Sequence, residues 1–201
     1  MFKRLFDITV SLLCMIIIFP IAIIIIILIK LDSKGPFLFS TYRTGRKWKL
    51  FKIYKFRSMK IKSSLTDSGI TSIDDSRITR VGNILRRFRL DEIPQLYNVL
   101  KGDMSIVGPR PEDPKYVSFF KHKYEKLLLV RPGCVSPGWI AYRDEKVFKK
   151  QKSPNSELVE KYYIENVLPK KIDKDLKYIE EMSFFRDIII LYQSVFSLLF
   201  K

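Results

Sequence analysis

The sequence contains very little cysteine or histidine: its 201 residues include two cysteines and one histidine. Cys14 and Cys134 are far apart, and Cys14 lies inside an apolar run. A disulfide framework is therefore not expected, and nothing indicates an oxidising compartment. Without a Cys and His cluster, a zinc centre is also disfavoured. A hard cation held by carboxylate oxygens remains open.

Acidic residues are scarce relative to basic ones. The chain has 21 Asp and Glu against 37 Lys and Arg, which gives a formal net charge of +16. Residues 1–32 carry almost none of this excess, so the positive charge lies downstream. Such a charge fits three kinds of partner: nucleic acid, an anionic membrane surface, or phosphorylated substrates.

Residues 8–29 contain no charged side chain and are long enough to span a bilayer. The run is too long for a signal peptide, and no small-x-small cleavage site follows it. Basic residues flank both ends: Lys3 and Arg4 before it, Lys30 and Lys34 after it. The positive-inside rule favours basic flanks on one face of the membrane. A straight span and a re-entrant hairpin bent at Pro20 both remain open, since proline bends a helix but is tolerated in membrane helices.

The pattern downstream predicts an α+β fold that is mostly helical, with short strands. Strands are expected at 37–40 and 50–59, a polar loop at 61–75, and Pro/Gly-rich turns at 108–114 and 131–138. A helix should begin at Asp75 or Ser76 and end near Arg89, and further helices are expected at 91–100, 156–167 and 169–181. The apolar segment at 184–200 has an uncharged part too short to span, so it should lie in the membrane interface or in the core.

An adjacent acidic pair, Asp91 and Glu92, stands at the head of the helix predicted at 91–100. Such a pair usually does no more than start an exposed helix. At a helix N-terminus, however, the free amides and the dipole stabilise a carboxylate and attract phosphate. An ionised Asp can attack phosphorus to form an aspartyl-phosphate, and its neighbour could bind Mg²⁺ or carry a proton.

Arg110 lies between Pro109 and Pro111, which restrict the backbone around it. Its guanidinium suits bidentate phosphate binding, although a plain surface arginine is the competing interpretation. Arg86 is close enough in sequence to Asp91 to meet the same phosphate, or is one more solvated helix charge. Lys55 is a weaker candidate, and His122 is expected to be structural or exposed.

Six motifs together resemble the bacterial sugar transferase family, the small monotopic phosphoglycosyl transferases that act on polyprenyl phosphate. They are FKRLFD at 2–7, FKIYKFRSM at 51–59, LDE at 90–92, NVLKGDMS at 98–105, VGPRP at 107–111 and VRPG at 130–133. The chain departs from the family pattern at two places. It has Phe19-Pro20 where the family often has Ser-Pro. After Gly133 the family commonly reads Ile-Thr-Gly-Trp-Ala, whereas this chain has two more residues before its tryptophan, Trp139.

The resemblance implies a monotopic fold: a re-entrant membrane helix at 1–33, broken at Pro20, and a cytoplasmic catalytic domain at 34–201 with interfacial C-terminal helices. It implies that the bacterial inner membrane holds the protein with the catalytic domain facing the cytoplasm. It leaves the oligomeric state open, with a homodimer as one alternative.

The resemblance also implies a reaction. Asp91 would attack the sugar-bearing phosphate of a UDP-sugar and expel UMP, and undecaprenyl phosphate or a related polyprenyl phosphate would then take the phosphosugar. Mg²⁺ would bind at Asp91 and Glu92, with Glu92 acting as base or metal ligand. Phosphate or donor contacts would come from the remaining site residues: Arg86, Arg110, Lys55, Gly108 and Pro109.

Two other functions compete with this enzyme hypothesis. The net charge is compatible with a membrane-tethered nucleic-acid-binding module, but the sequence has no recognised nucleic-acid motif and its arginines cluster beside acidic residues. A plain anchor or scaffold would leave the Gly-Pro-Arg-Pro turn without a purpose.

Overall fold

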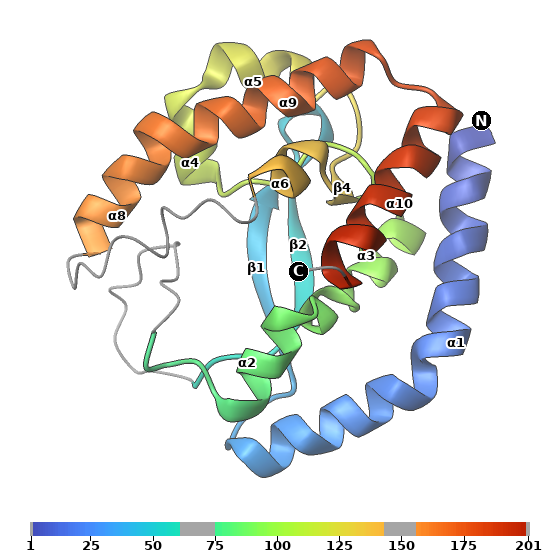
Figure 1. Cartoon of the computed structure of the whole chain (residues 1–201), viewed down its shortest axis with the longest axis vertical. Helices are drawn as coiled ribbons and strands as arrows, with labels where there is room; N and C mark the ends of the chain where they lie inside the picture. The colour runs from blue at the N-terminus through green and yellow to red at the C-terminus, as the bar shows by residue number, and fades with distance from the viewer. Residues whose placement is uncertain (1, 61–74, 143–155, 200–201) are drawn as a thin grey trace.

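The computed structural model describes residues 2–60, 75–142 and 156–199. Its first element is α1 (Phe2–Asp32), which descends along one side of the molecule, bends, and continues beneath it (Figure 1). Pro20 lies inside α1 and supplies the physical cause of a bend, because it removes a backbone donor and crowds the preceding turn. In the described part of the chain, α1 is the helix that is long and apolar enough to cross a membrane.

Both ends of α1 are attached to the rest of the protein. Near its start, Asp7 and Ser11 are buried, and near its end Ile25 and Ile29 are buried. No side chain of residues 12–24 is buried between them. The middle of α1 therefore presents apolar side chains outward while the two ends pack.

Charged side chains make these attachments specific. Arg4 donates to the carbonyl oxygens of Val99 and Leu100 at 2.6 and 2.8 Å, and so satisfies the C-terminal end of α3 (Gln95–Lys101). At the other end of α1, Arg57 is almost fully buried and donates to the carbonyl oxygen of Lys34 at 2.8 Å. Asp32 accepts from the amide of Val81 at 2.9 Å, which ties α1 to α2 (Arg80–Arg87).

The strands β1 (Leu38–Thr44) and β2 (Leu50–Phe56) form an antiparallel hairpin. The short helix η1 (Arg46–Trp48) lies at its tip, where Lys47 and Trp48 have left-handed backbones with φ of 55° and 63°. Both strands were predicted, but β1 runs four residues further than expected, and β2 ends three residues earlier.

The helix predicted from Asp75 or Ser76 begins later, which makes that expected start wrong. Thr79 is the N-cap of α2, and its hydroxyl accepts from the amide of Gly82 at 2.9 Å. Asp75 instead pairs with the guanidinium of Arg77. Of the loop predicted at 61–75, residues 61–74 lie outside the described residues.

A second, parallel pair of strands lies between the helices. β3 (Ser105–Val107) pairs with β4 (Gly133–Val135), a strand inside the segment predicted to be only a turn. The strands approach closely at two glycines: a Cβ on Gly108 would lie 2.6 Å from the carbonyl oxygen of Arg131, and a Cβ on Gly133 would collide with the backbone of Gly108. Between and after them come α4 (Pro114–Phe119), α5 (Lys121–Leu127) and α6 (Pro137–Ala141).

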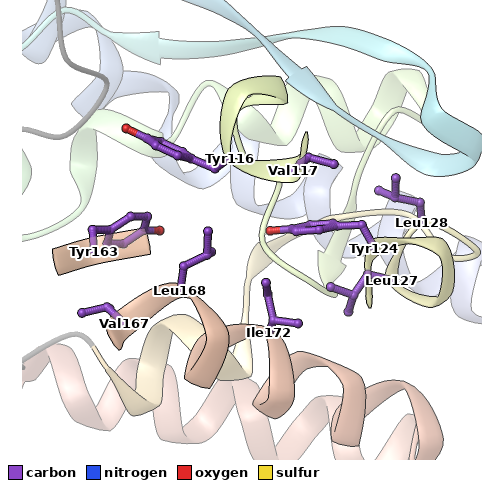
Figure 2. Packing of buried hydrophobic residues seen from close by; sticks show 9 residues of the cluster. All are labelled: Tyr116, Val117, Tyr124, Leu127, Leu128, Tyr163, Val167, Leu168 and Ile172. Carbon is purple, nitrogen blue, oxygen red and sulfur yellow. The ribbon is translucent and has the colours of Figure 1, made fainter. Parts of the chain in front are cut away.

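The C-terminal part is helical. α8 (Ser156–Tyr162) continues through a π-helical turn, η3 (Tyr163–Val167), into α9 (Leu168–Glu180), so the two helices expected here form one. The inner face of η3 and α9 packs on α4 and α5, as Figure 2 shows for nine buried residues. They are Tyr116, Val117, Tyr124, Leu127, Leu128, Tyr163, Val167, Leu168 and Ile172.

The last helix, α10 (Phe184–Leu199), lies beside the first half of α1 (Figure 1). Lys3 pairs with the buried carboxylate of Asp187, and Phe184 packs edge-on against Phe2 and Phe6. One face of α10 is buried, whereas Phe185 and Tyr192 on another face are mostly exposed. The fold is mostly helical with a few short strands, as predicted.

Candidate active site

The acidic pair lies in a 3-10 turn, η2 (Leu90–Glu92), and not in the first turn of the following helix. α3 begins at Gln95 with Pro94 as its N-cap residue, so the predicted start of that helix at residue 91 was four residues too early. The turn is preceded by Arg89, whose backbone is left-handed with φ of 60°. Asp91 is 8% exposed, and the side chain of Glu92 is 12% exposed.

Two cations hold Glu92. The ammonium of Lys55 lies 2.8 Å from Oε1, and the guanidinium of Arg89 pairs with Oε2. Phe51, Ile53 and Lys55 lie on the same face of β2, because side chains in a strand alternate. The first two are buried in the core, and Lys55, at the end of that row, reaches Glu92.

These cations determine the charge state of Glu92. Burial by itself would raise the pKa of this carboxyl, but the charges of Lys55 and Arg89 outweigh burial and hold the pKa well below its ordinary value. Arg110 contributes in the same direction, which places its charge close to Glu92. Glu92 is therefore ionised across the physiological pH range.

Asp91 differs from its neighbour. Burial raises the pKa of the Asp91 carboxyl above its ordinary value, and the negative charge of Glu92 adds to the increase. The nearby cations Lys55, Arg89 and Arg86 oppose the increase. Within the described part of the chain, no hydrogen bond engages the Asp91 carboxylate. A buried carboxylate that is surrounded by cations and bonded to none of them is available to react or to bind a metal.

Arg86 comes to this site from α2. Its Nε donates to the hydroxyl of Ser58 at 2.8 Å, and its charge acts on Asp91. α2 approaches Ser58 closely at Gly82, where any Cβ would collide with the Ser58 carbonyl. Burial lowers the pKa of Arg86 from its ordinary value.

The turn after β3 presents Arg110. Gly108 and Pro109 are buried, and their backbone groups bond to β4: the Gly108 amide to the Val135 carbonyl at 3.0 Å, the Gly133 amide to the Pro109 carbonyl at 2.8 Å. In this structure Gly108 and Pro109 hold the turn that carries Arg110. Their predicted contact with the phosphate or the sugar-donor substrate stays a prediction. The Nε of Arg110 is 3.6 Å from the Glu112 carboxylate.

Sequence reasoning missed Asp175, a buried carboxylate on α9. It accepts hydrogen bonds from the backbone amides of Arg110 at 3.0 Å and Gly138 at 2.8 Å. It also accepts a hydrogen bond from the hydroxyl of Ser136. Burial raises the pKa of Asp175 to about 6. Asp175 thereby joins the Arg110 turn to the start of α6, and no local pattern in the sequence signals this long-range contact.

Arg89 and Trp139 were also missed. The guanidinium of Arg89 lies 3.7 Å from the centroid of the Trp139 ring, which α6 supplies. Arg89 belongs to the arginine-rich run before Asp91, and the sequence predicted it only as the approximate end of a helix. The Pro137-Gly138-Trp139 sequence marked a turn, but nothing in it located the partner of the indole.

The carboxylates suit one kind of metal. The described residues contain no group of three or more Asp, Glu, His or Cys side chains that could enclose an ion. Two adjacent carboxylates can still hold Mg²⁺, which keeps much of its water and commonly takes further oxygen ligands from substrate phosphates. The unbonded Asp91 carboxylate fits that requirement, and the basic residues around it fit the phosphates.

Comparison with known proteins identifies the family. The model of the bacterial sugar transferase family matches residues 1–201, so the chain belongs to that family. A UDP-glucose:undecaprenyl-phosphate glucose-1-phosphate transferase of Escherichia coli is 37% identical over 96% of this chain and 39% of its own length. An N-acetylgalactosaminephosphotransferase of Aeromonas hydrophila, named for UDP-N-acetylgalactosamine and undecaprenyl phosphate, is 34% identical over 98% of this chain and 43% of its own length.

A relative from Caulobacter vibrioides, named as a UDP-glucose:undecaprenyl-phosphate glucose-1-phosphate transferase, is 33% identical over 98% of this chain and 69% of its own length. The chain thus spans less than half of the first two relatives and about two thirds of the third.

Proposed function

We propose that this chain transfers a sugar-1-phosphate from a UDP-sugar to undecaprenyl phosphate or a related polyprenyl phosphate. The observation that carries the proposal is the pair of buried carboxylates: Asp91 is unbonded, and Glu92 is held by two cations. The names of the relatives supply the donor and acceptor classes. A nucleic-acid-binding role is less well supported, because the arginines of this site converge on buried acids that a nucleic acid would avoid.

In the proposed reaction, an Asp91 oxygen attacks the sugar-bearing phosphorus of the donor. The new bond joins that oxygen to phosphorus, the bond from phosphorus to the bridging oxygen breaks, and UMP leaves with its electron pair. An oxygen of the polyprenyl phosphate then attacks the same phosphorus. This step forms the polyprenyl diphosphosugar and releases Asp91 as a carboxylate.

The other residues hold charge. Arg110 and Arg86 would bind phosphate oxygens, because a guanidinium forms charge-assisted, bidentate hydrogen bonds. Asp91 and Glu92 would hold a Mg²⁺ ion, which supplies neutralisation of phosphate charge. Glu92 has a lowered pKa and two cationic partners, so it is a poor proton acceptor. We therefore assign it to charge positioning and metal binding.

We also propose that α1 is a re-entrant membrane helix bent at Pro20, followed by a catalytic domain on the cytoplasmic face of the bacterial inner membrane. Its two ends, at Arg4 and Asp32, bond to the same body of the protein. A straight span would place these ends on opposite sides of a bilayer. Cysteines introduced at Lys3 and Lys34 should therefore react with an impermeant thiol reagent from the same face, and labelling from opposite faces would refute the hairpin.

The activity can be tested with the purified chain in lipid nanodiscs, supplied with Mg²⁺, polyprenyl phosphate and a panel of UDP-sugars. We expect UMP release with at least one donor. The Asp91→Asn variant should lose turnover, and a variant that turns over normally would contradict the nucleophile assignment. Without acceptor, the wild-type chain should gain the mass of a phosphosugar at Asp91.

A further inference from the structure

The guanidinium of Arg89 contacts both the Glu92 carboxylate and the ring of Trp139. Its Nη2 pairs with the Glu92 carboxylate, and its central carbon lies 3.7 Å from the indole centroid. The side chain of Arg89 is 21% exposed, so this contact is largely shielded from water. A guanidinium that stacks on an aromatic face and is partly desolvated is strongly restricted in orientation.

The backbone of Arg89 is constrained as well. It is one of three non-glycine residues with positive φ in the described part of the chain, and the other two are at the hairpin tip. A left-handed backbone is unfavourable for a residue with a Cβ, so it persists where the surroundings enforce it. The side chain that this backbone carries pairs with Glu92.

Trp139 is itself fixed in place. It follows the N-cap of α6, where the hydroxyl of Ser136 accepts from the Trp139 amide at 3.0 Å. α6 is pressed against α9 at Gly138, whose Cβ would collide with the Lys171 carbonyl. Asp175 bonds to both Ser136 and Gly138. These contacts fix the backbone that carries the indole.

We propose that Arg89 and Trp139 form a positioning pair: Trp139 orients the Arg89 guanidinium, and Arg89 fixes the Glu92 carboxylate beside Asp91. The inference deepens the proposed phosphoglycosyl transfer and rests on it. Neither residue is assigned a contact with substrate. Lys55 holds the other Glu92 oxygen, so loss of the pair leaves Glu92 attached but free to rotate about one contact.

The main test compares Arg89→Gln and Trp139→Leu with the wild-type chain in nanodiscs. Partners that orient a metal-binding residue typically contribute about 10–100-fold to activity or metal affinity. We expect kcat for UMP release to fall by about 10–100-fold, with KM for the UDP-sugar changing little. The Mg²⁺ concentration for half-maximal rate should rise. Arg89→Lys and Trp139→Phe should recover part of the loss, because each keeps a cation or an aromatic face.

A matched control lies two residues before Arg89. Arg87 lies 5.6 Å from the ring centroid of Phe88 at the exposed end of α2, a similar cation–aromatic contact that does not reach the acidic pair. Arg87→Gln should leave kcat and the Mg²⁺ dependence unchanged. If the wild type is active and the Arg89 and Trp139 variants match it in both quantities, the pair has no positioning role. If the wild type releases no UMP from any donor, the proposed function fails first.

The double variant tests whether Trp139 acts through Arg89 or independently of it. If Trp139 acts through Arg89, the combination of Arg89→Gln with Trp139→Leu should be no slower than the slower single variant. Losses that multiply would mean that Trp139 acts independently, which overturns the pair.

Fluorescence tests the contact itself even where activity is lost. The chain has two tryptophans. A Trp48→Phe background leaves Trp139 as the single tryptophan, and adding Arg89→Gln should change its emission. Identical spectra before and after that change would show that the stack is absent in solution.

Discussion

The buried carboxylate of Asp7 connects α1 to the strand that leads to the Arg110 turn, and its removal should destabilise the protein. Asp7 is 2% exposed. It accepts from the hydroxyl of Ser105 at 2.9 Å and from the amide of Ile106 at 3.1 Å. In Asp7→Ala both donors stay buried without this acceptor, and each such loss costs about 1–3 kcal/mol. Because the Ser105 hydroxyl can rotate toward another acceptor, we expect a total of about 2–4 kcal/mol.

The measurement is thermal unfolding of the variants and the wild type in the same lipid nanodisc. A loss of this size lowers the Tm of a chain of this length by about 5–15 °C. Asp7→Asn should lose less, because its carbonyl oxygen can still accept from Ile106 and its amide can donate to Ser105. The KM for the UDP-sugar should rise in Asp7→Ala, since β3 runs directly into the Arg110 turn.

Ser11 provides the control for this experiment. It lies one turn after Asp7 on the same face of α1 and is fully buried, but its hydroxyl has no hydrogen-bond partner. Ser11→Ala should therefore leave the Tm unchanged or raise it. The reasoning is refuted if Asp7→Ala shifts the Tm by less than about 2 °C, the equivalent of roughly 0.5 kcal/mol, or if both variants lower the Tm equally.

Lys55→Met should lower thermal stability by about 1.5–3 kcal/mol and slow UMP release, because it removes a hydrogen bond to the ionised Glu92. Lys123→Met breaks an exposed ion pair and should cost less than about 1 kcal/mol. Equal losses in the two variants would contradict the distinction between a buried and an exposed ion pair. Asp175 has its pKa raised to about 6, so between pH 4 and 6 the folded chain holds a proton that the unfolded chain releases. Its contribution to stability is therefore full below about pH 4 and is lost, by up to about 3 kcal/mol, as the pH rises through about 6. The Tm difference between wild type and Asp175→Asn should change across that window, and a constant difference would oppose the assignment. Gly133→Ala should separate β3 from β4, lowering both the Tm and the rate of UMP release; wild-type values for both would show that the strands tolerate a Cβ there.

Local patterns predicted most elements, and the errors have local causes. Asp75 looked like the helix cap because its side chain can accept from the backbone, but it is occupied by Arg77, and Thr79 caps α2 instead. The predicted break between the C-terminal helices was placed before Pro169. Proline is tolerated near the start of a helix, and the chain continues from α8 through a π-helical turn into α9. β4 was missed because its three residues have no alternation long enough to recognise.

The candidate site likewise contains residues that the sequence predicted and residues that only the fold revealed. Asp91, Glu92 and Arg110 were found from residue types and turn chemistry within one short stretch. Lys55 and Arg86 also came from the sequence, although their partners, Glu92 and Ser58, became clear only from the fold. Trp139 and Asp175 were missed because each acts through residues that only the tertiary fold brings near them.

The sequence alone determined that two adjacent carboxylates stand in a basic chain, close to a restrained arginine and downstream of a membrane-length apolar run. The family resemblance gave the two carboxylates different roles, but the residues themselves showed no physical difference between them, because neighbouring Asp and Glu side chains have nearly the same intrinsic chemistry. The tertiary structure makes the distinction: β2 and Arg89 bring two cations onto Glu92, while Asp91 is buried beside them without a bond. The physical reason is that burial and long-range charge, which shift the pKa values of the two groups in opposite directions, exist only after the chain has folded.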